Sequence, residues 1–117
     1  MMFQPVNHEL NRFDFPTDVE AVVELLLQDL SLRDKVIMAH LSESELGPVY
    51  VGMAETIRKE FQLNGGGNPA LLSSCRRYMR EMNYPLMDPA MVIVREIWKK
   101  VRRTHRLRVI ERHHARK

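Results

Sequence analysis

Apolar residues recur at intervals of three and four along most of this chain, which is the spacing of one face of an α-helix. Between Val19 and Leu30 they fall at i, i+3, i+4, i+7, i+8 and i+11, so an amphipathic helix is expected over about residues 17–30. Thr17 and Glu20 fit a capping box at its start. No stretch shows sustained alternation at period two, the spacing of a half-buried strand. The pattern therefore predicts an all-α fold.

Proline indicates where three further helices begin. Pro48, Pro69 and Pro89 each follow a turn-forming residue, and proline at the first helical position loses no intrahelical hydrogen bond. The first of these helices is expected over about residues 48–63 and should end at the glycine run 65–67. The three prolines therefore predict helix starts rather than kinks.

A fifth helix is expected to begin at Ser31, between the helix of residues 17–30 and the helix that starts at Pro48. Its apolar side is less regular than the others and is read as Leu32, Val36, His40 and Leu41. The helical periodicity of the whole chain then predicts one shared core. Its expected members include Leu26, Leu27, Ile57, Phe61, Leu71, Ile93 and Ile97.

The last helix has no breaker after Pro89 and could run to Arg112. Its apolar stripe thins after Val101, so its final turns could project from the body or fray. The chain therefore divides into an irregular arm over residues 1–14, a helical domain over 15–101 and a basic extension over 102–117. Together these make a single-domain bundle of about five helices with a long basic C-terminal helix.

Composition narrows the class of protein. The chain has 117 residues, 44% of them hydrophobic, which is ordinary for one soluble domain. Cys75 is the only cysteine, so no intrachain disulfide can form, as is typical of a reducing compartment. The first residues lack the basic and apolar regions of a signal peptide, and no apolar run approaches the ~20 residues of a membrane span. We expect a cytoplasmic protein that does not cross a membrane.

Charge is distributed unevenly along the chain. Residues 1–94 carry 8 Lys/Arg and 13 Asp/Glu, a net charge of −5, whereas residues 95–117 carry 10 Lys/Arg and two Glu, a net charge of +8. Such asymmetry predicts either an anionic partner or a basic segment that neutralises the chain's own acidic surface. A second basic cluster, Arg76, Arg77 and Arg80, should face solvent. The candidate partner-binding residues near the C-terminus are Arg95, Lys99, Lys100, Arg102, Arg103, Arg106 and Arg108.

Catalytic, metal and cofactor motifs do not stand out. The glycine run 65–67 lacks the Lys-Ser/Thr of a phosphate-binding loop, and a flexible turn is the better interpretation. The five histidines lack zinc-site spacing. Cys75 lies on an apolar helix face, where an inert buried thiol is expected. We predict no catalytic residue, no cofactor and no small-molecule ligand.

A set of spaced residues recurs through the predicted helices and the turns between them. They are Phe15-Pro16, Leu26 to Ser31, Asp34-Lys35, Leu41, Glu43, Glu45-Leu46, Gly52, Ile57-Arg58, Phe61, Leu63, Asn68, Leu71 and Asp88-Pro89. This pattern resembles a family of small, uncharacterised, mostly bacterial all-helical domains. The resemblance covers roughly residues 15–95 and departs from the family's G-x-x-I-R-N and Trp motif, because Lys59 stands for Asn and Phe61 for Trp. It implies a helical fold and no catalytic role.

Three functions are compatible with these observations. The favoured one is a non-enzymatic interaction module that binds a protein partner or self-associates, since no base-reading motif is visible. The alternative is electrostatic, sequence-independent nucleic-acid binding through residues 95–117. A helix-turn-helix over 49–82 is weak because the connection is longer than usual. An enzyme assembled from distant residues is the least favoured.

Overall fold

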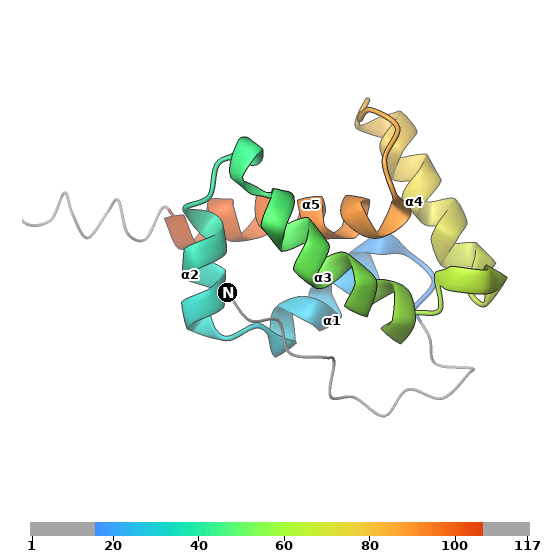
Figure 1. Ribbon diagram of the computed structural model, residues 1–117, viewed down its shortest axis with the longest axis horizontal. Helices are drawn as coiled ribbons and strands as arrows, with labels where there is room; N and C mark the ends of the chain where they lie inside the picture. Colours follow the sequence, from blue (N-terminus) through green and yellow to red (C-terminus); the bar gives the residue numbers. More distant parts are fainter. Residues whose placement is uncertain (1–15, 107–117) are drawn as a thin grey trace, which may run out of the picture.

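Helix α5 (Pro89–Val101) forms the centre of the molecule, and the other four helices pack around it (Figure 1). The computed structural model describes residues 16–106, and no strand occurs in that range. The predicted all-α bundle of five helices is therefore confirmed. The surrounding helices are α1 (Val19–Asp29), α2 (Leu32–Ala39), α3 (Gly47–Glu60) and α4 (Pro69–Glu81). Shorter turns are η1 (Glu43–Glu45), η2 (Asn64–Gly66) and η3 (Arg102–Arg106).

The central place of α5 follows from its sequence. Apolar residues cover so much of its circumference that it can contact α1, α2, α3 and α4 together. Seven of its thirteen residues are buried, which makes it the most buried helix of the described chain. They are Ala90, Val92, Ile93, Val94, Ile97, Trp98 and Val101.

The predicted core is largely confirmed. Six of the seven residues named from periodicity have no exposed surface, and they come from α1, α3, α4 and α5 or directly follow α3. Leu27 is only half-buried and packs at the edge of the same core. Met38, Met53 and Leu46, all without exposed surface, complete an aliphatic interior with few aromatic rings.

The three prolines lie where the sequence predicted them. Pro69 and Pro89 are the first residues of α4 and α5, and Pro48 is the second residue of α3. Asn68 and Asp88 provide the side-chain caps, accepting hydrogen bonds from the backbone N–H of Leu71 and Ala90. None of the three prolines interrupts a helix.

Two predicted helix ends were wrong. α1 is capped by Asp18, whose carboxylate accepts from the N–H of Ala21, so Thr17 is not the capping residue. α3 ends at Glu60 rather than near Leu63, because Gln62 takes the left-handed backbone conformation with φ 59°. The Leu63 N–H then bonds the Arg58 carbonyl, as in a helix-terminating turn.

The predicted apolar side of α2 was wrong at Leu32 and His40, whereas Leu41 packs against the core as predicted. Leu32 is 64% exposed, while Met38 and Ala39 form the buried side of this short helix. His40 is exposed, and its Nδ1 lies 2.8 Å from the Val36 carbonyl. The misreading arose because a helix of eight residues has too few turns to define a stripe.

The long basic helix predicted to reach Arg112 is not confirmed. α5 ends at Val101, and Arg102–Arg106 form a wider π-helical turn that packs against α2. The predicted arm 1–14 and most of the extension 102–117 lie outside the described residues. Within residues 16–106, no helix is both long and apolar enough to cross a membrane.

Candidate functional site

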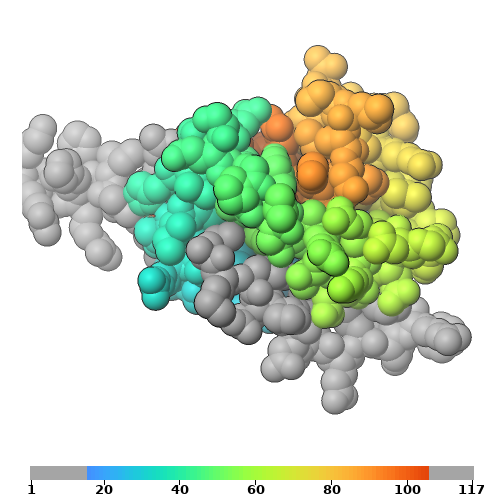
Figure 2. All heavy atoms as spheres, in the orientation of Figure 1, coloured from blue at the N-terminus to red at the C-terminus, as the bar shows by residue number. Residues whose placement is uncertain are grey.

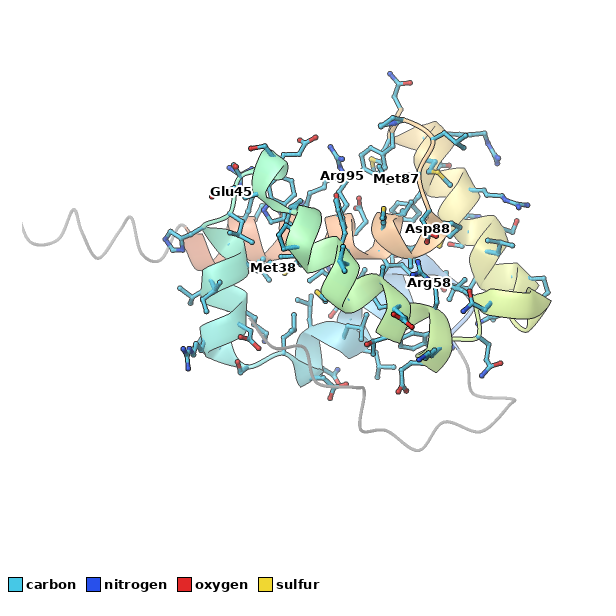
Figure 3. All side chains as sticks on the ribbon, in the orientation of Figure 1. Met38, Glu45, Arg58, Met87, Asp88 and Arg95 are labelled. Carbon is cyan, nitrogen blue, oxygen red and sulfur yellow. The ribbon has the colours of Figure 1, made fainter. Side chains whose placement is uncertain are left out.

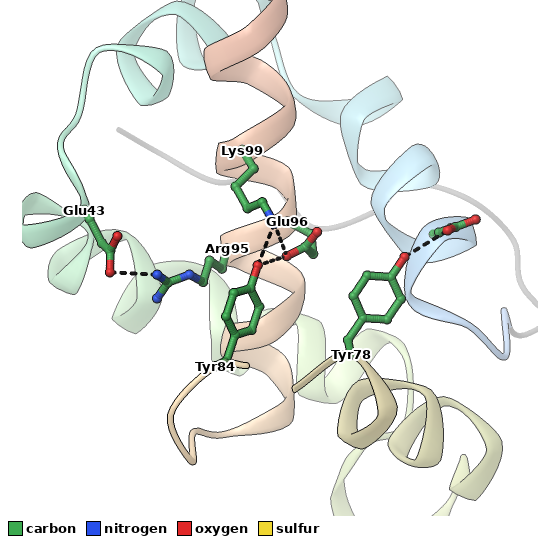
Figure 4. A network of polar contacts seen from close by, with 7 residues as sticks. Glu43, Tyr78, Tyr84, Arg95, Glu96 and Lys99 are labelled. Atoms are coloured by element: carbon green, nitrogen blue, oxygen red, sulfur yellow. Dashed lines mark hydrogen bonds and ion pairs between the residues drawn. The ribbon is translucent and has the colours of Figure 1, made fainter. Parts of the chain in front are cut away.

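The first predicted site residue, Arg95, is engaged inside the molecule. Its guanidinium lies 2.7 Å from the Glu43 carboxylate of η1 and 4.7 Å from the centre of the Tyr84 ring (Figure 4). Only 16% of its side chain is exposed. Burial lowers the pKa of Arg95, but the hydrogen bond and charge of Glu43 outweigh it, so the pKa is raised. Arg95 therefore joins η1 to α5 as a fixed cation.

Lys99 belongs to a second internal network, one turn along α5. Its Nζ donates to the Tyr84 hydroxyl at 2.8 Å and lies 3.3 Å from Glu96, while the Tyr84 hydroxyl donates to the same carboxylate (Figure 4). Burial lowers the pKa of Lys99, but these contacts outweigh it and raise the pKa. The network attaches the loop after α4 to the surface of α5.

Two further predicted residues also have partners in the fold. Lys100 forms an ion pair with Glu24 of α1. The Arg102 guanidinium lies 4.8 Å from the centre of the Trp98 ring, within the range of a cation–π contact. Of these four cations, Arg95 connects α5 to η1, Lys99 connects it to the α4–α5 loop and Lys100 connects it to α1. Arg102 contacts the indole ring of Trp98, which belongs to α5.

The remaining predicted site residues differ from these four. Arg103 is exposed and, within residues 16–106, has no hydrogen bond or ion pair to its guanidinium. The side chain of Arg106 and the whole of Arg108 lie outside the described part of the chain. The structure thus does not bring the seven predicted residues together as one free basic surface.

A groove of about 430 Å³ runs between α1, α4 and α5. Glu20 accepts a hydrogen bond from the Tyr78 hydroxyl at 2.9 Å, and the Lys100–Glu24 and Lys99–Glu96 pairs also lie along it. Its charged groups therefore largely neutralise one another. The arrangement singles out no ligand.

The second basic cluster lies on the outer face of α4. Arg76, Arg77 and Arg80 are exposed, on the side opposite the buried Leu71 and Cys75, as the sequence predicted. Within residues 16–106 no hydrogen bond or ion pair engages their guanidinium groups. Unlike the cations of α5, these three are not used by the described fold.

An exposed apolar side chain lies just beyond the end of α4. Leu86 is 97% exposed. An open depression of about 460 Å³ lies beside it, lined by Met79, Arg80, Asn83, Tyr84 and Leu86. The end of α4 and its loop, coloured from yellow to orange, stand out from the body (Figure 2). We call Arg76, Arg77, Arg80, Leu86 and this depression the α4 surface.

Backbone and side-chain contacts hold the α4–α5 loop in place. Asn83 adopts φ 56° and ends α4, and the Tyr84 N–H then bonds the Met79 carbonyl at 2.9 Å. At the other end of the loop, Asp88 pairs with Arg58 of α3 at 3.1 Å (Figure 3). Leu86 is therefore presented by a loop anchored on both sides.

Sequence reasoning identified the three arginines but missed the apolar part of the α4 surface. The available signal was the segment Asn83–Met87, where Leu86 and Met87 follow a proline and belong to no helical period. Because such a residue lies on no apolar helix face, periodicity does not predict that it is buried, and it is a candidate for exposure.

Metal and nucleophile chemistry find little support in the described chain. Residues 16–106 contain no group of three or more His, Cys, Asp or Glu side chains placed to hold a metal ion. Cys75 is buried, and desolvation, followed by the charge of Asp88, raises its pKa to about 12. The thiol is therefore protonated at neutral pH, as expected for an inert packing residue.

Comparison with known proteins gives no family or relative: no protein family, no characterised protein and no solved structure matches the chain. The resemblance to small bacterial helical domains stays a prediction. The α4 surface and the internal contacts of the α5 cations are therefore the features that bear on function.

Proposed function

We propose that this chain is a small, non-enzymatic helical interaction module that binds a protein partner through the α4 surface. The observation that carries the proposal is the nearly complete exposure of Leu86 beside Arg80, which shares the outer face of α4 with Arg76 and Arg77, three arginines with no partner in residues 16–106. Methionine, tyrosine and arginine are enriched in protein interfaces, and all three line this surface. Helix α4 and the anchored loop after it present them without a large ordering cost.

Self-association through the same surface is less favoured. Most homodimers are two-fold symmetric, so the same patch meets itself across the interface. Arg76, Arg77 and Arg80 of one copy would then face those of the other, and Glu81 is the one acidic residue within α4. Like charges brought together across an interface oppose association.

Nucleic-acid binding through residues 95–117 remains the alternative proposal. Its support is weakened because Arg95, Lys99, Lys100 and Arg102 already contact groups inside the fold. Binding through about four phosphate contacts would lower log affinity with log salt at a slope near −3.6 on duplex DNA. A salt-sensitive, sequence-independent affinity of that kind would favour this alternative over the protein-binding module.

Site-specific photo-crosslinking tests the proposed function. A photoreactive amino acid is placed at Leu86 and, as the control, at Val51, which is 77% exposed and belongs to α3, a helix that contributes no residue to the α4 surface. In the cells that make the protein, we expect discrete nuclease-resistant crosslinked proteins from position 86 and not from position 51. Equal crosslinking at both positions, or none at 86, would contradict the proposal.

A further inference from the structure

The α4 surface joins its charged and apolar parts at a single residue. Arg80 belongs to the exposed arginine cluster and also lines the depression next to Leu86. A partner that fills this depression therefore places its own side chains directly beside a guanidinium. The complementary chemistry is an apolar side chain with a carboxylate close to it.

The depression itself has no acidic wall. Met79, Arg80, Asn83, Tyr84 and Leu86 line it, and none of them carries a negative charge. Of the acidic side chains around it, Glu96 accepts a hydrogen bond from the Tyr84 hydroxyl and pairs with Lys99, and Asp88 is paired with Arg58. Glu81 directly follows Arg80 in the chain. A basic partner would thus meet little compensating charge here, whereas an acidic one would meet three arginines.

The exposed apolar groups argue for protein over nucleic acid as the occupant. Phosphate contacts come from cationic and hydrogen-bonding groups, and the side chains of Leu86 and Met79, which line the depression, offer a phosphate backbone nothing of the kind. The same side chains would bury apolar area against a protein. Arginine together with apolar anchors is typical of protein interfaces.

Resting on the proposed function, we infer that the partner presents an acidic amphipathic helix. Its apolar side chains would cover Leu86 and enter the depression, while carboxylates one turn away would pair with Arg76, Arg77 and Arg80. A helix suits such a partner because its residues three and four apart lie on one face. The partner's apolar and acidic side chains must likewise share one face if they are to meet Leu86 and the arginines together. The arginines can hold carboxylates with two parallel hydrogen bonds.

The test is an amide NMR titration of the full chain with designed peptides. The probe is a helical peptide of about 18 residues, long enough to populate helix in water, with leucines on one face and glutamates flanking them. Two matched peptides replace every glutamate by glutamine or every leucine by serine. Duplex DNA serves as the competing class of ligand.

We expect the leucine–glutamate peptide to shift amide signals of residues 76–88 and to bind at least about tenfold more tightly than either matched peptide, a difference of about 1.4 kcal/mol. The Leu86→Ser variant and the triple variant R76Q/R77Q/R80Q should each lose about tenfold or more. The matched control Val51→Ser should bind as the parent does.

Several outcomes would overturn the inference. They are an absence of shifts at 76–88, equal affinity for all three peptides, shifts centred on α2 or α5, or stronger shifts at 76–88 with DNA than with peptide. If the Leu86 crosslink to protein is present while the peptides fail, the partner chemistry is wrong and the interaction function stands. If that crosslink is absent, the proposed function itself fails.

Discussion

Arg95 and Glu43 are separated by 52 residues in the chain, yet their side chains lie 2.7 Å apart and join the central helix to η1. The contact accounts for a residue that sequence alone placed in a partner-binding stripe. Arg95 is largely enclosed, and the Tyr84 ring covers part of its guanidinium. Its role in the described fold is structural.

The Arg95–Glu43 contact should contribute measurably to stability. We expect Arg95→Ala to lower the free energy of unfolding by about 1 kcal/mol, because a charge-assisted hydrogen bond between a largely enclosed guanidinium and a more exposed carboxylate is lost. A double-mutant cycle with Glu43→Ala should give a coupling energy of about 0.5 kcal/mol or more. Additive effects in urea denaturation would show that the two side chains do not interact in solution.

Asn68 should be among the polar residues least tolerant of change. It is 6% exposed, and its amide nitrogen donates to the carbonyls of Pro16 and Phe61, both at 3.1 Å. We expect Asn68→Ala to cost about 2–3 kcal/mol, since a cap and two bonds to carbonyls are lost.

The matched variant Asn68→Asp separates capping from donation. Aspartate keeps the acceptor for the Leu71 N–H, but an ionised carboxylate cannot donate to the two carbonyls. We expect a loss of stability at pH 7 that shrinks as the carboxyl is protonated below its pKa. A variant as stable as the parent at pH 7 in chemical denaturation would contradict this account.

Tyr78 should make the protein less stable at high pH. Desolvation, followed by the hydrogen bond to Glu20 and nearby carboxylates, raises its pKa to about 12 from the ordinary value near 10. The unfolded chain then loses the proton first, so the stability that Tyr78 contributes is complete below pH 10 and is lost as pH rises towards 12.

Spectroscopic titration checks this prediction. We expect tyrosinate absorbance of the folded protein to rise later than that of the denatured chain, and Tyr78→Phe to remove the latest component. The slope of unfolding free energy against pH between 10 and 12 should also become shallower in Tyr78→Phe. An unchanged slope would mean that Tyr78 titrates normally.

Gln62 occupies a backbone conformation that favours glycine. Its φ is 59°, and Gly65 in the same connection has φ 69° with nothing within 4 Å of an added Cβ. We expect Gln62→Gly to stabilise the protein by about 0.5–1 kcal/mol and Gly65→Ala to destabilise it by about 1 kcal/mol. Thermal unfolding of the two variants should move in opposite directions; a shift of both in the same direction would exclude backbone strain as the cause.

Local sequence signals were sufficient for most of the fold. The capped prolines at 69 and 89 fix where α4 and α5 begin, and the long apolar stripe of α5 identifies the most buried helix. The end of α3 could not be predicted, because Gln62 rather than a glycine takes the left-handed conformation. Likewise α2 was too short for periodicity to identify its buried side.

The candidate site was harder to predict because charge alone does not reveal pairing. Arg95 and Arg80 look equivalent in sequence, but one meets Glu43 across 52 residues and the other meets no partner within residues 16–106. Only the position of η1 beside α5, which brings Glu43 to Arg95, creates that difference. The exposure of Leu86 depends in the same way on the loop geometry imposed by Asn83 and Tyr84.

The cations of α5 stabilise the fold, whereas we propose that those of α4 remain free for a partner. Urea denaturation of two matched triple variants, R95Q/K99Q/K100Q and R76Q/R77Q/R80Q, separates the two roles, since each variant replaces three cations on one helix with glutamine. We expect the free energy of unfolding to fall by about 2–4 kcal/mol in the α5 variant and to change by no more than about 0.5 kcal/mol in the α4 variant. Equal losses, or a larger loss for the α4 variant, would contradict this division of roles.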